Sequence, residues 1–176
     1  MKKILERIES IINKKNPVKN EYAEIVQDIL LNDEFLKLQN FYHHNSSIYE
    51  HAIIVSYFSY RICKYLNLDY RSAARGGLLH DFFLYDWRKH RRSALTKNKL
   101  HGRAHPEIAL RNSMKHFELN NIEKDIILKH MWPLTFRPPR YQESFIVTFT
   151  DKYIASKEYI GEFRKRKMKR KTNTTI

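Results

Sequence analysis

The chain has 176 residues, 42% of them hydrophobic and 13% aromatic, so it can form one domain with a buried core and is not largely disordered. Four glycines and five prolines are too few for an all-β protein, and the single cysteine, Cys63, excludes an internal disulfide and a multi-thiolate metal site. The formal net charge of +14 favours anionic partners, which include phosphorylated small molecules, nucleic acid and acidic proteins.

Helical periodicity dominates the first half of the chain. Apolar residues recur at intervals of three or four over residues 4–12 and 22–30, which predicts two short helices. A third helix is expected over 34–41, and the longest one over about 47–66. A further helix is predicted over 70–83.

The second half is interrupted by polar and proline-containing stretches. Residues 87–103 show little periodicity and are predicted to form a loop. Pro106 follows His105 at the position where proline best begins a helix, another helix ends near His130, and a last helix spans about 141–159. Polar side chains suited to N-caps precede four of the predicted helices: Asn32 or Asp33, Ser46 or Ser47, Asp69, and Asn120 or Asn121.

These patterns predict an all-α protein with a single helical domain. It would comprise N-terminal helices over 1–40 packed on the core, a core over 41–160, and a basic, flexible tail over 161–176. Seven of the eight residues from Arg164 to Lys171 are Lys or Arg. Nucleic-acid binding by this tail is the less favoured alternative to a solvated segment, because no aromatic residues are interleaved to stack on bases. No run of about 18 apolar residues occurs, so we expect no membrane span and a cytoplasmic location.

The most informative motif is the His80–Asp81 pair, which lies between apolar residues in Gly-Gly-Leu-Leu-His-Asp-Phe-Phe. Burying a carboxylate beside an imidazole costs several kcal/mol without compensation, and a cation is the simplest compensation. Gly76 and Gly77, one helical turn earlier, would allow a neighbouring element to approach closely. A structural pair with satisfied hydrogen bonds is the alternative to a metal site.

Two further potential ligands occupy helical positions that face inward. His51 lies on the same side of its helix as much of the apolar surface, and Asp151 interrupts an otherwise apolar or small pattern. With His80 and Asp81 they form a set of nitrogen and oxygen ligands, which suits Mn, Fe, Zn, Ni, Co or Mg. We therefore predict a divalent metal centre.

This ordered set resembles the HD superfamily of metal-dependent phosphohydrolases, whose pattern is a histidine, a His-Asp pair and a distant aspartate. The resemblance covers roughly residues 41–158 and implies an HD-type helical bundle in which His51, His80, Asp81 and Asp151 hold a metal ion. It also implies hydrolysis of a phosphoester by metal-activated water, with His80 and Asp81 as catalytic residues. A small phosphorylated substrate, above all a nucleotide, would be the partner.

His105 and His130 fall in the intervals where binuclear members of the superfamily place ligands of a second metal. The resemblance therefore implies two divalent ions, with Asp81 bridging from the first group to His105 and His130. The alternative for each histidine is a structural role at a helix terminus.

Four other residues are candidates for substrate binding: His44, Arg137, Arg140 and Lys152. His44 precedes the first ligand helix, the two arginines follow His130 in a loop where guanidinium groups could bind phosphate, and Lys152 follows the last ligand. Solvent exposure is the alternative for each of them.

The ligand pattern leaves more than one function open. The chain lacks the Gly-Tyr-Pro signature of cyclic dinucleotide phosphodiesterases, so their substrate is not expected here. A diiron oxygenase is one alternative, because the family resembling myo-inositol oxygenase uses the same six-ligand arrangement. A non-catalytic nucleotide-sensing module is the other.

Overall fold

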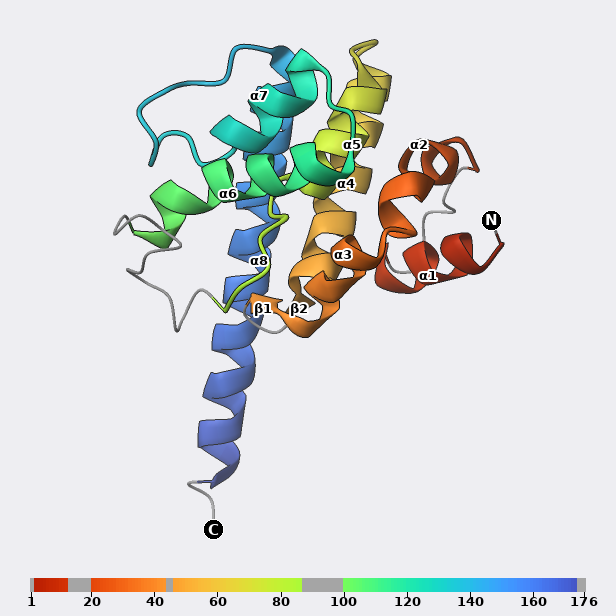
Figure 1. Ribbon diagram of the computed structural model, residues 1–176. Coiled ribbons are helices and arrows are strands. Elements are labelled where there is room, and N and C mark those ends of the chain that lie inside the picture. The colour runs from red at the N-terminus through yellow and green to blue at the C-terminus, as the bar shows by residue number, and fades with distance from the viewer. Residues whose placement is uncertain (1, 13–19, 44–45, 87–99, 174–176) are drawn as a thin grey trace.

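The computed structural model describes residues 2–12, 20–43, 46–86 and 100–173, with side chains described for 6–12, 20–42, 46–86 and 100–161. Within these ranges the chain is an all-α, single-domain bundle, as predicted (Figure 1). Its eight α-helices are α1 (Lys2–Ile12), α2 (Asn20–Leu30), α3 (Asp33–Leu36), α4 (Ile48–Tyr65), α5 (Tyr70–Leu79), α6 (His101–His116), α7 (Asn121–Lys129) and α8 (Gln142–Asn173). A 3₁₀ helix, η1 (Lys37–Asn40), and an antiparallel ladder of β1 (Tyr42–His43) with β2 (Ser46–Ser47) precede α4.

Polar side chains determine where several helices begin, because the first N–H groups of a helix have no partner within it. At α4, Ser47 Oγ accepts a hydrogen bond from the Glu50 N–H at 3.2 Å, and the Glu50 carboxylate accepts one from the Ser47 N–H at 3.1 Å. Asn120 and Glu123 form the same reciprocal pair at α7. The remaining two caps are Asn32 before α3 and Asp69 before α5.

Several helix boundaries differ from the prediction. The helix predicted over 34–41 is α3 followed by η1. α5 ends at Leu79 rather than near residue 83, because the chain turns tightly after His80 and the Phe82 N–H donates to the Leu79 carbonyl at 3.1 Å. α6 begins at His101 rather than Pro106, so the proline lies inside the helix. Proline removes one backbone hydrogen bond there, but burial of the apolar face of α6 in the core outweighs that loss.

α8 is longer than the sequence pattern indicated. It begins at Gln142 and continues to Asn173, whereas we predicted an end near Tyr159. Lys, Arg and Glu favour helical backbone, and no proline interrupts this stretch. Residues 161–173 of the predicted tail therefore have helical backbone. These last turns of α8 extend away from the rest of the bundle (Figure 1).

α4 lies at the centre of the bundle and packs against α5 and α8 (Figure 1). Its apolar side chains share one core cluster with buried residues of α1, α2 and α3. A buried hydrogen-bond chain crosses this core: Tyr22 OH donates to Ser56 Oγ at 2.8 Å, and Ser56 Oγ donates to the Ala74 carbonyl at 2.6 Å. Cys63 is buried, and burial raises the pKa of its thiol to about 12.

Two glycines allow α5 to pack closely against its neighbours. A Cβ on Gly77 would lie 3.0 Å from the Cα of Ser56 in α4, and a Cβ on Gly76 would lie 2.7 Å from Cδ1 of Ile126 in α7. The prediction of close approach at these glycines is therefore confirmed. This packing brings the end of α5, and with it the His80–Asp81 pair, next to α4 and α7.

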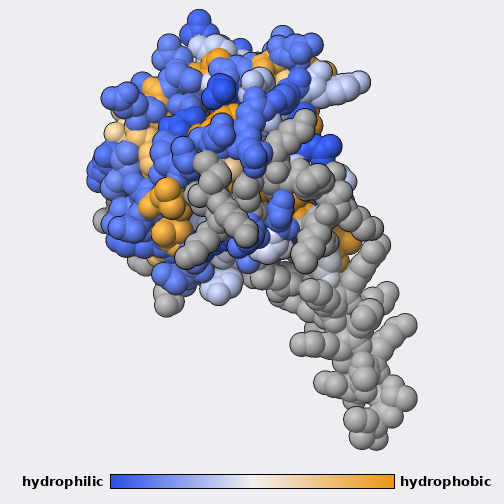
Figure 2. All heavy atoms as spheres, turned by 90° about the vertical axis from the view of Figure 1, so that its right-hand side faces the viewer, coloured by the Kyte–Doolittle hydropathy of each residue, from blue (hydrophilic) through white to orange (hydrophobic). Residues whose placement is uncertain are grey.

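The face seen in Figure 2 is largely hydrophilic, with separate hydrophobic areas, in keeping with a mean hydropathy of −0.64. None of the helices in the described ranges is long and apolar enough to cross a membrane.

Candidate metal centre

Five helices bring the six predicted ligands to one buried place. His51 and Asp151 are in contact although 100 residues separate them in the chain. All six side chains belong to buried residues. They are His51 from the first turn of α4, His80 and Asp81 from the end of α5, His105 from α6, His130 from the end of α7 and Asp151 from α8.

The first group of ligands lies between α4, the end of α5 and α8. Candidate ligand atoms of His51, His80 and Asp81 all lie within 4.8 Å of one another. His51 Nε2 is 3.0 Å from Asp151 Oδ1, and His80 Nε2 is 3.6 Å from the same oxygen. These side chains could hold one metal ion, with Asp151 within reach of it.

The second group shares Asp81 with the first. Asp81 Oδ1 lies 3.2 Å from His105 Nε2 and 3.5 Å from His130 Nε2, while Asp81 Oδ2 lies 3.5 Å from His80 Nε2. The two oxygens of one carboxylate therefore face different groups of histidines. Two buried His/Asp groups that share Asp81 could thus hold metal ions.

Backbone carbonyls orient three of the four histidines. The Nδ1–H of His80 donates to the Gly77 carbonyl at 2.7 Å, that of His105 to the His101 carbonyl at 3.0 Å, and that of His130 to the Ile127 carbonyl at 2.9 Å. Each bond places the proton on Nδ1 and leaves Nε2 to face the centre. The Nε2 atoms are therefore the potential metal ligands.

His51 is oriented by a side chain instead. Its Nδ1 lies 3.3 Å from Oε2 of Glu158, and Ser46 Oγ donates to Oε1 of the same carboxylate at 2.9 Å. Sequence reasoning missed Glu158. The available signal was its spacing, because residues seven apart, such as Asp151 and Glu158, lie on the same face of a helix.

The acidic groups of the centre are strongly stabilised as carboxylates. Burial opposes their ionisation, but the adjacent imidazoles hold the pKa of Asp81 and Asp151 well below the ordinary value. Burial likewise opposes a charge on His51, yet the carboxylates of Asp151 and Glu158 raise its pKa to about 10. A proton and a metal ion would therefore compete for His51 Nε2.

The remaining polar atoms also fit a cation. His80 Nε2 and Asp81 Oδ1 are buried, and neither has a hydrogen-bond partner in the described ranges. Burial and the neighbouring imidazoles of His105 and His80 lower the pKa of His130 to about 3, which keeps this imidazole neutral, as a metal ligand must be. Leaving such atoms without a partner is costly, and a divalent ion would satisfy them.

A cavity of about 230 Å³ opens onto the ligands. Lys152, one of the four substrate-binding candidates, lines it, and its Nζ donates to the His130 carbonyl at 2.8 Å. Burial lowers the pKa of this half-buried lysine. The cavity is lined by His51, Asp81, His101, Gly102, His105, His130, Met131, Asp151, Lys152 and Ala155.

His101, which was not among the predicted site residues, lines the same cavity. Its ring stacks on that of His105, with centroids 4.6 Å apart and planes inclined by 22°. Its Nδ1 lies 2.9 Å from the hydroxyl of Tyr85. His101 therefore supports the position of a predicted ligand and forms part of the cavity wall.

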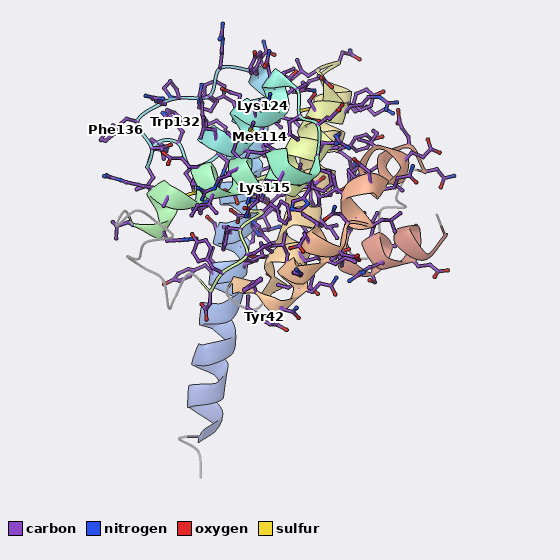
Figure 3. All side chains as sticks on the ribbon, viewed as in Figure 1. Tyr42, Met114, Lys115, Lys124, Trp132 and Phe136 are labelled. Atoms are coloured by element: carbon purple, nitrogen blue, oxygen red, sulfur yellow. The ribbon has the colours of Figure 1, made fainter. Side chains whose placement is uncertain are left out.

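The other substrate-binding candidates are placed elsewhere. Arg137 and Arg140 are exposed, and neither lines the cavity within the described part of the chain. His44 lies outside the described residues, as does the predicted loop segment 87–99. Trp132 lies in the segment between α7 and α8 (Figure 3). Its ring packs edge-on against that of Phe145 in α8, with ring centroids 5.9 Å apart.

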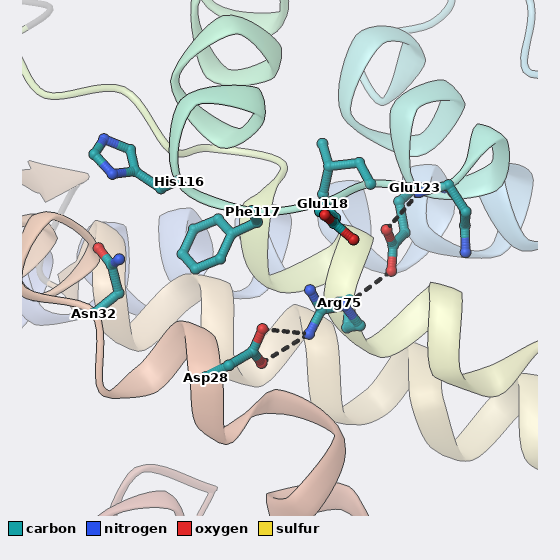
Figure 4. Close-up of a pocket in the computed structure, with 9 residues that line it drawn as sticks. Asp28, Asn32, Arg75, His116, Phe117, Glu118 and Glu123 are labelled. Carbon is teal, nitrogen blue, oxygen red and sulfur yellow. Dashed lines mark hydrogen bonds and ion pairs between the residues drawn. The ribbon is translucent and has the colours of Figure 1, made fainter.

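A larger surface cavity of about 790 Å³ lies between α2, α5 and the start of α7 (Figure 4). Arg75 is its central cation. The Arg75 Nη1 donates to both carboxylate oxygens of Asp28, at 2.7 and 2.8 Å, and Nε donates to Glu123 at 3.0 Å. Two carboxylates already neutralise this guanidinium, so we do not assign an anion site here.

Comparisons of the chain with protein-family models, with curated proteins and with solved structures found no significant match. The capacity to bind metal therefore rests on the geometry of the buried His/Asp groups.

Proposed function

We propose that this protein is a binuclear metal-dependent phosphohydrolase of the HD type, with nucleotides as the leading substrate class. The observation that carries the proposal is the position of Asp81, whose two oxygens face different groups of histidines at 3.2 to 3.5 Å. A carboxylate that belongs to both groups could bridge two metal ions and so support a two-metal hydrolytic site. The six ligands also follow the order of the HD pattern along the chain.

Some residues of the site would bind metal, and Lys152 would bind substrate. Divalent ions at these ligands would supply an activated water and neutralise charge on the phosphoryl oxygens. Asp81 would hold the centre together, because it belongs to both groups, and His80 would support it from the first group. Lys152 would bind a phosphoryl oxygen, since its ammonium lines the cavity and has only the His130 carbonyl as a described hydrogen-bond partner.

The volume of the cavity limits how much of a substrate it can enclose. A volume of about 230 Å³ is below the range of about 300–1,000 Å³ that is typical of sites enclosing a whole drug-sized ligand. It suits the phosphoryl end of a substrate, with the remainder extending outward. Met131 and Ala155 supply apolar surface on the wall.

Metal analysis followed by a substrate screen tests the proposal. We expect about two equivalents of metal in carefully isolated protein, and hydrolysis of nucleotides or other phosphoesters when that metal is supplied. Asp81→Asn serves as the inactive control. Oxygen consumption by the iron-loaded protein with a polyol or phosphonate would indicate the oxygenase alternative. Nucleotide binding without turnover in every divalent metal would indicate a sensing module.

A further inference from the structure

We propose that Glu158 is a positioning residue for His51 and makes the first group the tighter of the two metal sites. The inference rests on the proposed metal-dependent function and assigns a role to a residue outside the six ligands. Glu158 lies on α8, two helical turns beyond Asp151.

Two carboxylates of α8 flank the imidazole of His51, one beside each ring nitrogen. Asp151 Oδ1 is 3.0 Å from Nε2, and Glu158 Oε2 is 3.3 Å from Nδ1. The Ser46 hydroxyl donates to Glu158 Oε1 at 2.9 Å, which anchors the carboxylate to β2. Only 18% of the Glu158 side chain is exposed, so its contact with His51 is largely shielded from water.

The Nδ1 atom of His51 has a charged partner, whereas the Nδ1 atoms of the other three candidate ligand histidines have neutral partners. His80, His105 and His130 each donate from Nδ1 to a neutral backbone carbonyl. A carboxylate at Nδ1 favours the same tautomer but also makes the imidazole a stronger electron donor, which increases metal affinity. Of the four candidate ligand histidines, His51 is therefore the one whose Nδ1 partner most increases its affinity for a metal ion.

The number of carboxylates in each group also favours tighter metal binding by the first group than by the second. The first group has the carboxylates of Asp81 and Asp151 close to the metal position, with Glu158 behind His51. Among the residues that the structure describes, Asp81 is the one carboxylate of the second group. A divalent cation is more stable where more carboxylates surround it. Glu158 is not among the residues that line the cavity in the described part of the chain, so it would act through His51 and not on substrate.

Titration of the full-length protein with Co²⁺, followed by calorimetry and by visible absorption, tests this role without substrate. Glu158→Ala should weaken the tighter site about 10- to 100-fold and leave the weaker site unchanged. Glu158→Gln should weaken it less, because an amide oxygen keeps a partial negative charge beside Nδ1. In a His51→Ala background, Glu158→Ala should have no further effect on Co²⁺ affinity. Glu24→Gln, which removes one exposed carboxylate from α2, is the matched charge control.

The outcomes separate this inference from the proposed function. Two Co²⁺ sites with unchanged affinities in both Glu158 variants would overturn the role of Glu158 and leave the metal-dependent function intact. An equal loss at both sites in Glu158→Gln would also overturn it, because that result indicates a general structural role. Wild-type protein that binds no Co²⁺ would overturn both proposals.

Discussion

The Nε2 atoms of His105 and His130 face each other at 2.7 Å, although the two histidines belong to different helices. Two imidazole nitrogens at this distance require a cation or a shared proton between them, because two lone pairs would repel. Asp81 Oδ1 lies within 3.5 Å of both nitrogens and adds a negative charge. The fold therefore brings the potential ligands of the second group together from α5, α6 and α7.

Asp81→Ala is expected to abolish the binding of both metal ions and to reduce phosphoester hydrolysis to background. The reason is that Asp81 belongs to both groups of ligands. Elemental analysis and an activity assay measure the two effects, with Glu24→Ala as a surface control. Near-normal turnover in the Asp81 variant would exclude a bridging role.

His130→Ala is expected to lower the bound metal from two equivalents to one. His130 contributes to the second group, and the first group retains all of its ligands in this variant. Metal analysis of wild type and variant, purified side by side, gives the result. If both proteins contain the same amount of metal, His130 is not a ligand.

Lys152→Met should lower kcat/KM about 10- to 100-fold, which corresponds to the loss of one hydrogen bond from a charged donor. The metal content should not change, because Lys152 bonds the backbone carbonyl of His130 and not its ring. Arg140→Met is the control, since Arg140 is exposed and is not among the described cavity-lining residues. Equal activity losses in the two variants would argue against a specific role for Lys152.

Gly77→Ala should destabilise the protein by about 1–3 kcal/mol, because the new methyl group would lie 3.0 Å from the backbone of Ser56. Gly161→Ala is the matched change in α8, where an added Cβ would meet no atom within 4 Å. It should stabilise the helix by about 0.5–1 kcal/mol. Urea unfolding measures both free energies, and a stabilised Gly77 variant would contradict the close packing of α4 and α5.

The stability of the protein should depend on pH through Glu21. Hydrogen bonds from Lys64, Tyr60 and Tyr70 lower the pKa of Glu21 from 4.5 to about 2. Because the folded state lowers this pKa, the stabilisation is complete above pH 4.5 and is lost as the pH falls towards about 2.

Glu21→Gln should therefore reduce the difference in unfolding free energy between pH 6 and pH 3, as measured by urea titration. Glu24→Gln, an exposed change on the same helix, should retain the wild-type difference. The effect will be modest, because Glu21 is partly open to solvent and water screens its ion pair. An unchanged pH dependence in Glu21→Gln would contradict the role of this network.

Local patterns were sufficient to predict the helical fold class and most helix starts. Apolar periodicity and caps such as Ser47 and Asn120 act over a few residues, so they can be identified without tertiary structure. Four candidate ligands, His51, His80, Asp81 and Asp151, were also indicated by local sequence, since each is an ionisable residue in an apolar pattern, whereas His105 and His130 were indicated by the family resemblance. His80 and Asp81 are the clearest examples.

Other features depended on packing between distant segments. α6 begins before Pro106 because its apolar face is buried in the core, a gain that local proline rules do not include. Glu158 meets His51, and Lys152 reaches the His130 carbonyl, because α8 packs beside α4 and α7. Periodicity can place a side chain on one face of a helix, but the partner of that face is set by the free energy of burying the whole core.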